Sequence, residues 1–176
     1  EKDGISKRVK PKSFWHGSEF SSEAGTLQLK KIFQEKSFET PKSVDFIEYC
    51  LQQASNKDSI ILDSFAGSGT TAHAVLNLNK QDGGNRKFIL IEMEDYANTI
   101  TAERVKRVIK GYGEDKKAIE GTGGSFNYYE LGEPLFLEED ILNESVGIEN
   151  ILKYIWYSET RTPFTTIPDL AEANYR

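Results

Sequence analysis

The stretch Leu62-Asp63-Ser64-Phe65-Ala66-Gly67-Ser68-Gly69-Thr70-Thr71-Ala72 decides how this chain folds. It begins at the end of a short apolar run, Ile60-Ile61-Leu62, of the kind found in strands that are buried on both faces. The glycines end that strand, and residues 71–78 read as a helix. The sequence therefore predicts a strand, a glycine turn and a helix, and ligands bind at such junctions in open α/β sheets.

The same order of elements follows once more downstream. A second apolar run, residues 88–91, ends at Glu92, and residues 97–109 have helical spacing that Gly111 closes. Alternating strands and helices are typical of a parallel α/β sheet with right-handed crossovers. An acid at the end of the second strand can accept hydrogen bonds from both ribose hydroxyls of an adenosine ligand.

Further elements are expected on either side of this unit. Spacing and cap residues predict helices over residues 23–35 and 148–157 and a strand over residues 125–131. Another helix is expected to open at Pro41, with Thr40 as its N-cap.

Composition sets broad limits on the protein. The chain has 176 residues, of which 38% are hydrophobic and 28% are charged, as expected for one globular domain. No apolar stretch approaches the roughly 18 residues of a membrane span, and no signal-peptide core is visible, so a cytoplasmic location is expected. One cysteine and two distant histidines give no metal-ligand spacing, and no metal site is predicted.

Charge is distributed unevenly along the chain. Taken over the whole chain, the net charge of -6 argues against a nucleic-acid partner. Residues 2–12 and 104–117 are nevertheless locally basic. Residues 130–149 carry seven acids and no Lys or Arg. We interpret the cations from Arg104 to Lys110 as a solvated helix face, with phosphate contact as the alternative.

Three ligand classes are compatible with a glycine turn at this place. A P-loop requires a lysine after its last glycine, and Thr70 follows Gly69, so phosphate transfer is excluded. Gly67, Gly69 and Ala72 satisfy the G-x-G-x-x-A pattern of dinucleotide folds. Asp63 favours the third class, S-adenosylmethionine, because a carboxylate repels a pyrophosphate but suits a ligand that bears an ammonium and a sulfonium.

Residues 63–71 resemble the D-x-F-x-G-S-G-T-T motif of amino-methylating DNA methyltransferases. Residues 38–43 resemble the F-x-x-P-K motif that precedes it in the β class. Together with residues 88–92 and 123–131, they make the chain most similar to the modification subunit of type III restriction-modification systems, from about Trp15 to Leu137.

The resemblance implies a fold and a division into segments. The fold would be the Rossmann-like sheet of an S-adenosylmethionine-dependent methyltransferase, incomplete because the N-terminal half of the catalytic domain is missing. Residues 1–22 would be a linker from a preceding region and residues 23–131 the S-adenosylmethionine-binding α/β domain. Residues 132–176 would be a C-terminal extension for packing or subunit contact.

The resemblance also implies the residues that contact S-adenosylmethionine. Those on the glycine turn would surround the methionine and ribose: Asp63, Ser64, Phe65, Ala66, Gly67, Ser68, Gly69 and Thr70. Thr40, Lys42 and Ser43 would reach its carboxylate, with Lys42 as the counter-ion. Glu92 would hold the ribose hydroxyls, and Met93 would lie against the adenine.

The catalytic tetrapeptide of the family, [DNS]-P-P-[YFW], is absent, since all five prolines of the chain are isolated. In the β-class order it lies upstream with the target-recognition region, so the chain reads as a piece of a longer protein. We expect no catalytic residue here and no methyl transfer by this chain alone.

The predicted function is the S-adenosylmethionine-binding part of a site-specific DNA adenine-N6 methyltransferase of a type III restriction-modification system. The preference for adenine over cytosine-N4 depends on the resemblance alone. The expected partners are DNA, a restriction subunit and a second modification subunit. Binding to a membrane is not expected. The alternatives are a non-catalytic binding or assembly module of the same complex and, third, an NAD-dependent oxidoreductase.

Overall fold

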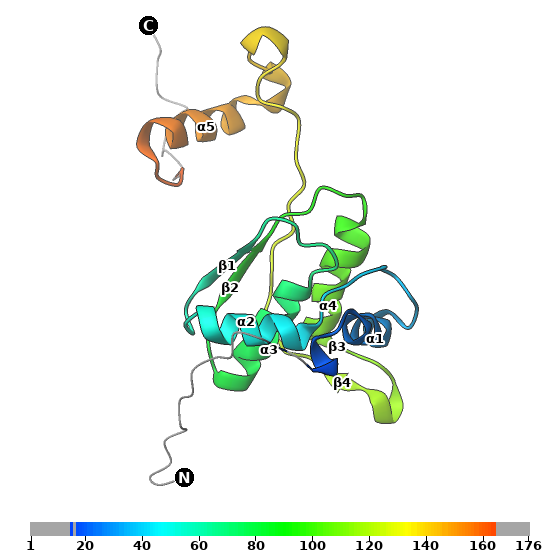
Figure 1. Cartoon of the computed structure of the whole chain (residues 1–176). Helices are drawn as coiled ribbons and strands as arrows, with labels where there is room; N and C mark the ends of the chain where they lie inside the picture. Colours follow the sequence, from blue (N-terminus) through cyan, green and yellow to red (C-terminus); the bar gives the residue numbers. More distant parts are fainter. Residues whose placement is uncertain (1–14, 16, 165–176) are drawn as a thin grey trace, which may run out of the picture. The chain divides into compact units, whose positions relative to one another are not determined.

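The computed structural model of the chain describes Trp15 and residues 17–164 (Figure 1). The chain forms two compact units that divide between Tyr128 and Tyr129. The basic segment at residues 2–12, and with it most of the predicted linker, lies outside the described residues.

The first unit contains one parallel strand pair and the helices around it. Its elements are η1 (Ser18–Phe20), α1 (Ser22–Phe33), α2 (Val44–Ala54), β1 (Ile60–Asp63), α3 (Thr70–Asp82), β2 (Lys87–Leu90), the π-helix η2 (Ala97–Ala102), α4 (Glu103–Lys110), β3 (Gly111–Tyr112), η3 (Asp115–Lys117) and β4 (Ile119–Glu120). β1 and β2 pair in parallel across the connection through α3, with Ile60 opposite Lys87 and Asp63 opposite Leu90. The predicted alternation of strand and helix is confirmed. The sheet has two strands within the described residues, so the larger Rossmann-like sheet stays a prediction.

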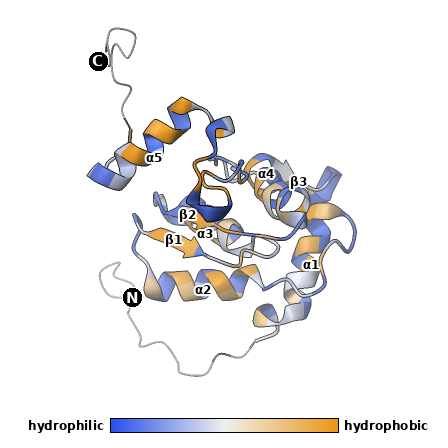
Figure 2. Cartoon of the chain, turned by 90° about the horizontal axis from the view of Figure 1, so that it is seen from above, coloured by the Kyte–Doolittle hydropathy of each residue, from blue (hydrophilic) through white to orange (hydrophobic). Residues whose placement is uncertain are grey.

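The expectation that the strands are buried on both faces is wrong. Phe88 and Leu90 pack against a buried core formed by α1, α3 and α4, with members Ile32, Ala72, Leu76, Val105 and Val108. On the opposite face, Ile60, Leu62 and Ile89 are 65%, 61% and 51% exposed. Figure 2 shows how apolar β1 is. An apolar run predicts burial only where both faces are covered, and this face is open in the described part of the chain.

The start of α2 also differs from the prediction. α2 begins at Val44, and its N-cap is Ser43, whose Oγ accepts a hydrogen bond from the backbone N–H of Phe46 at 3.4 Å. Thr40 is therefore not the cap. The segment before α2 packs against α1, where a side chain on the buried Gly25 would clash with the Pro41 carbonyl. This packing keeps the segment out of the helix.

The glycine cluster after α4 does not introduce a strand over residues 125–131. The amides of Thr122 and Gly123 donate to the carbonyls of Val108 and Ile109 at 3.0 and 3.1 Å, which satisfies the end of α4. Gly123 and Gly124 have φ of +73° and +95°, outside the extended region. The strands found here are the short antiparallel pair β3 and β4.

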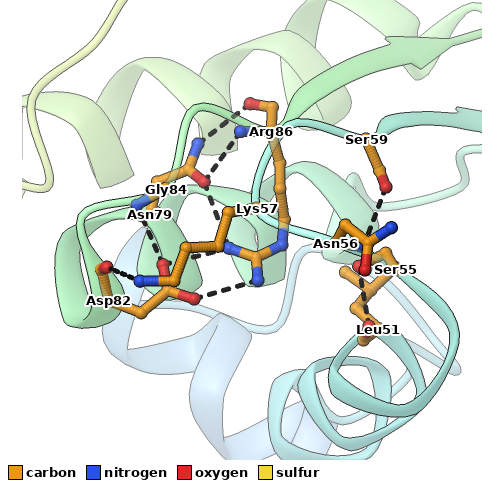
Figure 3. Close-up of polar contacts among 9 residues, drawn as sticks. All are labelled: Leu51, Ser55, Asn56, Lys57, Ser59, Asn79, Asp82, Gly84 and Arg86. Atoms are coloured by element: carbon orange, nitrogen blue, oxygen red, sulfur yellow. Dashed lines mark hydrogen bonds and ion pairs between the residues drawn. The ribbon is translucent and has the colours of Figure 1, made fainter.

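A polar cluster fixes the end of α3 and the turn into β2 (Figure 3). The buried Arg86 guanidinium donates two hydrogen bonds to the Asp82 carboxylate, at 3.0 and 2.9 Å. The Asn79 amide binds the backbone N–H and C=O of Arg86, at 3.0 and 2.9 Å. Lys57, just before β1, donates to the Asp82 carbonyl. These contacts hold the residues that precede β2 beside the residues that precede β1.

The second unit contains η4 (Glu138–Asp140), η5 (Glu144–Val146) and α5 (Ile148–Thr160), which confirms a helix over residues 148–157. Asn143 is buried and donates from its amide to the Pro134 carbonyl at 2.9 Å. Among the helices of the described residues, none is long and apolar enough to cross a bilayer.

Candidate functional site

A cavity of about 320 Å³ lies at the carboxyl end of β1. Its lining comes from the segment before α2, from α2 itself, and from the glycine turn with the first turn of α3: Phe38, Thr40, Pro41, Lys42, Ile47, Asp63, Phe65, Ala66, Gly67, Ser68, Thr70 and Thr71. Small-molecule sites typically have volumes of about 300–1,000 Å³. The fold thus brings together the motifs at residues 38–43 and 63–71, whose nearest ends are 20 positions apart in the sequence.

Eight of the thirteen predicted site residues line this cavity: Thr40, Lys42, Asp63, Phe65, Ala66, Gly67, Ser68 and Thr70. Ser43, Ser64, Gly69, Glu92 and Met93 do not. Four lining residues were not predicted: Phe38, Pro41, Ile47 and Thr71. Phe38, Pro41 and Thr71 lie within the two motifs, so the motifs could have indicated them. Ile47 lies on α2, outside both motifs, and no sequence signal singled it out.

Asp63 is oriented at the end of β1 by two hydrogen bonds. Its Oδ1 accepts from the backbone N–H of Phe65 at 3.2 Å, and its Oδ2 accepts from Thr71 Oγ1 at 2.5 Å. The carboxylate therefore joins the strand to the first turn of α3. A carboxylate accepts about four hydrogen bonds, so capacity for a ligand remains.

Glu92 follows the end of β2 and lies against the glycine turn. Its Oε2 accepts from the backbone N–H of Gly67 at 2.7 Å, and its Oε1 accepts from the amides of Met93 and Glu94 at 2.9 and 3.1 Å. Met93 itself is 87% exposed. Glu92 adjoins the cavity through Gly67 and has a structural contact that the sequence did not reveal.

The glycines of the turn adopt a conformation that other residues avoid. Gly67 and Gly69 have φ of +52° and +76°, and Gly69 is the N-cap of α3. A Cβ on Gly69 would lie 3.1 Å from the Thr101 carbonyl oxygen, whereas one on Gly67 would meet Phe38 at an ordinary 3.7 Å. Gly69 is thus the more tightly packed of the two glycines, and Gly67 faces the side of the turn where Phe38 borders the cavity.

Ser43 is almost completely buried, and its hydroxyl donates to the Glu19 carbonyl while capping α2. Its contacts belong to the fold. Ser64 directly follows β1, and it is exposed and outside the cavity lining. No group of three or more potential metal ligands occurs among the residues that the structure describes.

Arg104 corrects the prediction of a solvated basic helix face. Its side chain is fully buried behind the glycine turn, because α4 packs against α1 and α3 and turns this position inward. Lys106 and Lys110 are exposed as expected, and Arg107 is half-buried, with its guanidinium donating to the Ile32 carbonyl at 3.0 Å. Burial lowers the pKa of Arg104 to about 10, so the guanidinium remains charged at neutral pH.

His73 lies in the same buried region and is a packed residue. Its Nδ1 is 3.3 Å from a guanidinium nitrogen of Arg104. Burial, and secondly the charge of Arg104, lower the pKa of His73 to about 3. The imidazole is therefore neutral at physiological pH and available as a hydrogen-bond acceptor.

The chain matches one protein family and is similar to several individual proteins. A family described as "DNA methylase" matches residues 1–103, more than half of the chain. The type II methyltransferase M.KpnI of Klebsiella pneumoniae is 48% identical over 86 residues, which cover 49% of this chain and 21% of that protein. The Mod subunit of the type III restriction-modification enzyme EcoPI of Escherichia phage P1 is 40% identical over 115 residues, 57% of this chain and 18% of that protein.

The Mod subunit of StyLTI from Salmonella typhimurium is similar over a longer part of the chain. It is 33% identical over 128 residues, covering 65% of this chain and 20% of the relative. The resemblance to DNA modification methyltransferases is thus confirmed. The chain spans about a fifth of the length of these relatives.

Proposed function

The chain belongs to the DNA methylase family, and from this premise we propose that it is the S-adenosylmethionine-binding part of a site-specific DNA adenine-N6 methyltransferase of a type III restriction-modification system. The cavity at the carboxyl end of β1 is the proposed binding site. The observation that carries the proposal is the meeting of Lys42 and Asp63 on the wall of one cavity beside a left-handed glycine turn.

The two charges match the ligand. S-adenosylmethionine carries a carboxylate, an ammonium and a sulfonium, so a site for its methionine part needs a cation and an anion. Lys42 is the proposed counter-ion of the carboxylate, and Asp63 of the positive groups. Two hydrogen bonds already orient Asp63. A dinucleotide would instead place its pyrophosphate at this turn, where the Asp63 carboxylate disfavours it.

The remaining contacts follow from the position of the turn. Glu92 lies against Gly67 and is the proposed ribose ligand, and the exposed Met93 is the proposed adenine contact. The parallel pair β1–β2 joined through α3 supports a Rossmann-like sheet that gains further strands elsewhere in the parent protein. The open apolar face of β1 and β2 supports the same proposal.

Methyl transfer needs a flipped base whose amino group is aligned with the donor methyl. The cofactor supplies that methyl group when bound. The residues of this chain would bind and orient the cofactor, and the groups that hold the amine would come from the rest of the parent protein.

The proposed partners are those of a type III modification subunit: DNA, a restriction subunit and a second modification subunit, in the cytoplasm. The second unit supports a subunit contact, since α5 exposes 70% of Ile148, 49% of Ile155 and 54% of Tyr157. The acidic residues of this unit would complement a partner whose interface is bordered by basic residues.

Calorimetric titration of the 176-residue chain tests the proposal. S-adenosylhomocysteine should bind at one site per chain, and NAD should produce no saturable heat. A Lys42→Met substitution should weaken the binding of S-adenosylhomocysteine but not that of methylthioadenosine, which lacks the amino-acid carboxylate. Lys36→Met, outside the cavity, is the matched control. Binding of NAD alone would support the oxidoreductase, and binding of neither ligand would support a non-catalytic module.

A further inference from the structure

Arg104 is a buried cation that has no acidic partner among the residues that the structure describes. The ion pairs among the described residues join Lys80 to Glu120, Arg86 to Asp82, Arg107 to Glu103 and Lys153 to Glu149. Arg104 takes part in none of them, and its Nε has no hydrogen-bond partner. Buried charges are normally paired because their desolvation is costly. A purely structural position at the base of α4 would be filled more easily by an apolar side chain.

Three of the four hydrogen bonds of Arg104 reach the wall of the proposed ligand cavity, and the fourth joins it to His73. One terminal nitrogen donates to the Ser68 carbonyl at 3.2 Å, to Ser68 Oγ at 2.9 Å and to Thr70 Oγ1 at 2.8 Å. Ser68 and Thr70 both line the cavity. Thr70 Oγ1 in turn donates to the Lys42 carbonyl at 3.3 Å, so one path connects α4, the glycine turn and the segment that carries Lys42.

The helix that carries Arg104 holds the turn at a second point. Thr101, three residues earlier in the π-helix η2, donates from Oγ1 to the Gly67 carbonyl at 2.5 Å. Two consecutive carbonyls of the turn are therefore bound by one helical face. π-helical turns occur frequently at functional sites, where they change which residues share a face.

Arg104 also determines where the two hydroxyl protons point. A guanidinium only donates, so Ser68 Oγ and Thr70 Oγ1 both accept from it and must direct their own protons elsewhere. The Thr70 proton goes to the Lys42 carbonyl. The Ser68 proton is directed away from Arg104, either toward Thr70 Oγ1, which lies 3.3 Å from Ser68 Oγ, or toward a ligand in the cavity. A hydroxyl that accepts from a cation is also a stronger donor.

We propose that Arg104 is a positioning residue for the S-adenosylmethionine site, which presents the Ser68 hydroxyl as a donor to the methionine part of the ligand and couples the glycine turn to the Lys42 segment. This inference rests on the proposed function. Arg104 touches no ligand itself, and its effect passes through Ser68 and Thr70.

The test is the dissociation constant of S-adenosylhomocysteine, measured by calorimetry on the full 176-residue chain well below its melting temperature. Arg104→Met, of similar length and without charge, should weaken binding about tenfold or more. Arg104→Lys should recover part of the loss because it keeps the charge. Lys106→Met, an exposed cation on the same helix, is the matched control and should bind like the wild type.

A double-mutant cycle separates positioning from a merely structural role. Ser68→Ala should weaken binding in the wild-type background but change it less than twofold in the Arg104→Met background. Independent effects in the two backgrounds, or an Arg104→Met variant with lowered melting temperature and unchanged affinity, would overturn the proposal.

If the Arg104→Met variant does not fold, the Ser68→Ala and Thr70→Val variants test the proposal in its place. Each should weaken binding about threefold or more, and affinities within twofold of the wild type for both would overturn the proposal. Absence of S-adenosylhomocysteine binding by the wild-type chain would instead overturn the proposed function and this inference with it.

Discussion

Replacement of Glu92 separates its structural contact from its proposed ligand contact. Its carboxylate accepts three backbone N–H groups, of which those of Met93 and Glu94 are exposed and can turn to water in a Glu92→Ala variant. The Gly67 amide is half-buried and loses a charge-assisted bond of 2.7 Å. Such bonds contribute about 1.5–3 kcal/mol when buried, so we expect a loss of about 1–2 kcal/mol in unfolding free energy.

Two assays check the two contacts. Without ligand, Glu92→Ala should melt about 3–8 °C below the wild type. In calorimetry, the loss of one charge-assisted bond to a ribose hydroxyl, at the acceptor site that the three backbone bonds leave free, should weaken the binding of S-adenosylhomocysteine by about 1.5–3 kcal/mol, roughly 10- to 150-fold. Glu94→Ala removes the neighbouring exposed carboxylate and should change neither quantity. A melting temperature equal to that of the control would refute the Gly67 contact, and an unchanged affinity would refute the ribose contact.

Three further predictions follow from the site. Because the pKa of His73 falls from 6.5 in the unfolded chain to about 3 in the folded one, the unfolded state binds the extra proton below pH 6.5. The free energy of unfolding therefore keeps the full contribution of neutral His73 above pH 6.5 and decreases as the pH falls, by about 2 kcal/mol at pH 5 in urea denaturation. A His73→Gln variant whose unfolding free energy has the same pH dependence as the wild type would contradict this. Gly69→Ala should destabilise the chain by more than the about 1 kcal/mol expected for Gly67→Ala, since only Gly69 faces the Thr101 carbonyl, and the reverse order in urea denaturation would argue against the described turn. The chain alone should transfer no tritiated methyl group from S-adenosylmethionine to duplex or single-stranded DNA; incorporation would show that the missing tetrapeptide is not required.

Local sequence patterns predicted the order of elements and most of the cavity. A glycine turn between a short apolar run and a helix is specified within a few residues, so β1, the turn and α3 could be placed from residues 60–78 alone. The pairing of β1 with β2 follows from the helical connection between them.

The parts that were missed depend on contacts distant in sequence. Arg104 has the pattern of a surface cation, and its acceptors on Ser68 and Thr70 lie 36 and 34 positions earlier. The exposed face of β1 could not be foreseen from an apolar run, since the run does not say which elements cover it. The cap at Ser43 depends on packing of the preceding segment against Gly25.

The central claim is that S-adenosylmethionine binds at the glycine turn. A titration of the ¹⁵N-labelled chain with S-adenosylhomocysteine, followed by backbone amide NMR, tests it most directly. We predict saturable shifts of the Gly67, Ser68 and Gly69 amides and of the segment around Lys42, with the amides of β3 and β4, which are outside the cavity lining, unchanged. Shifts confined to other elements, or the same shifts on titration with NAD, would contradict the account.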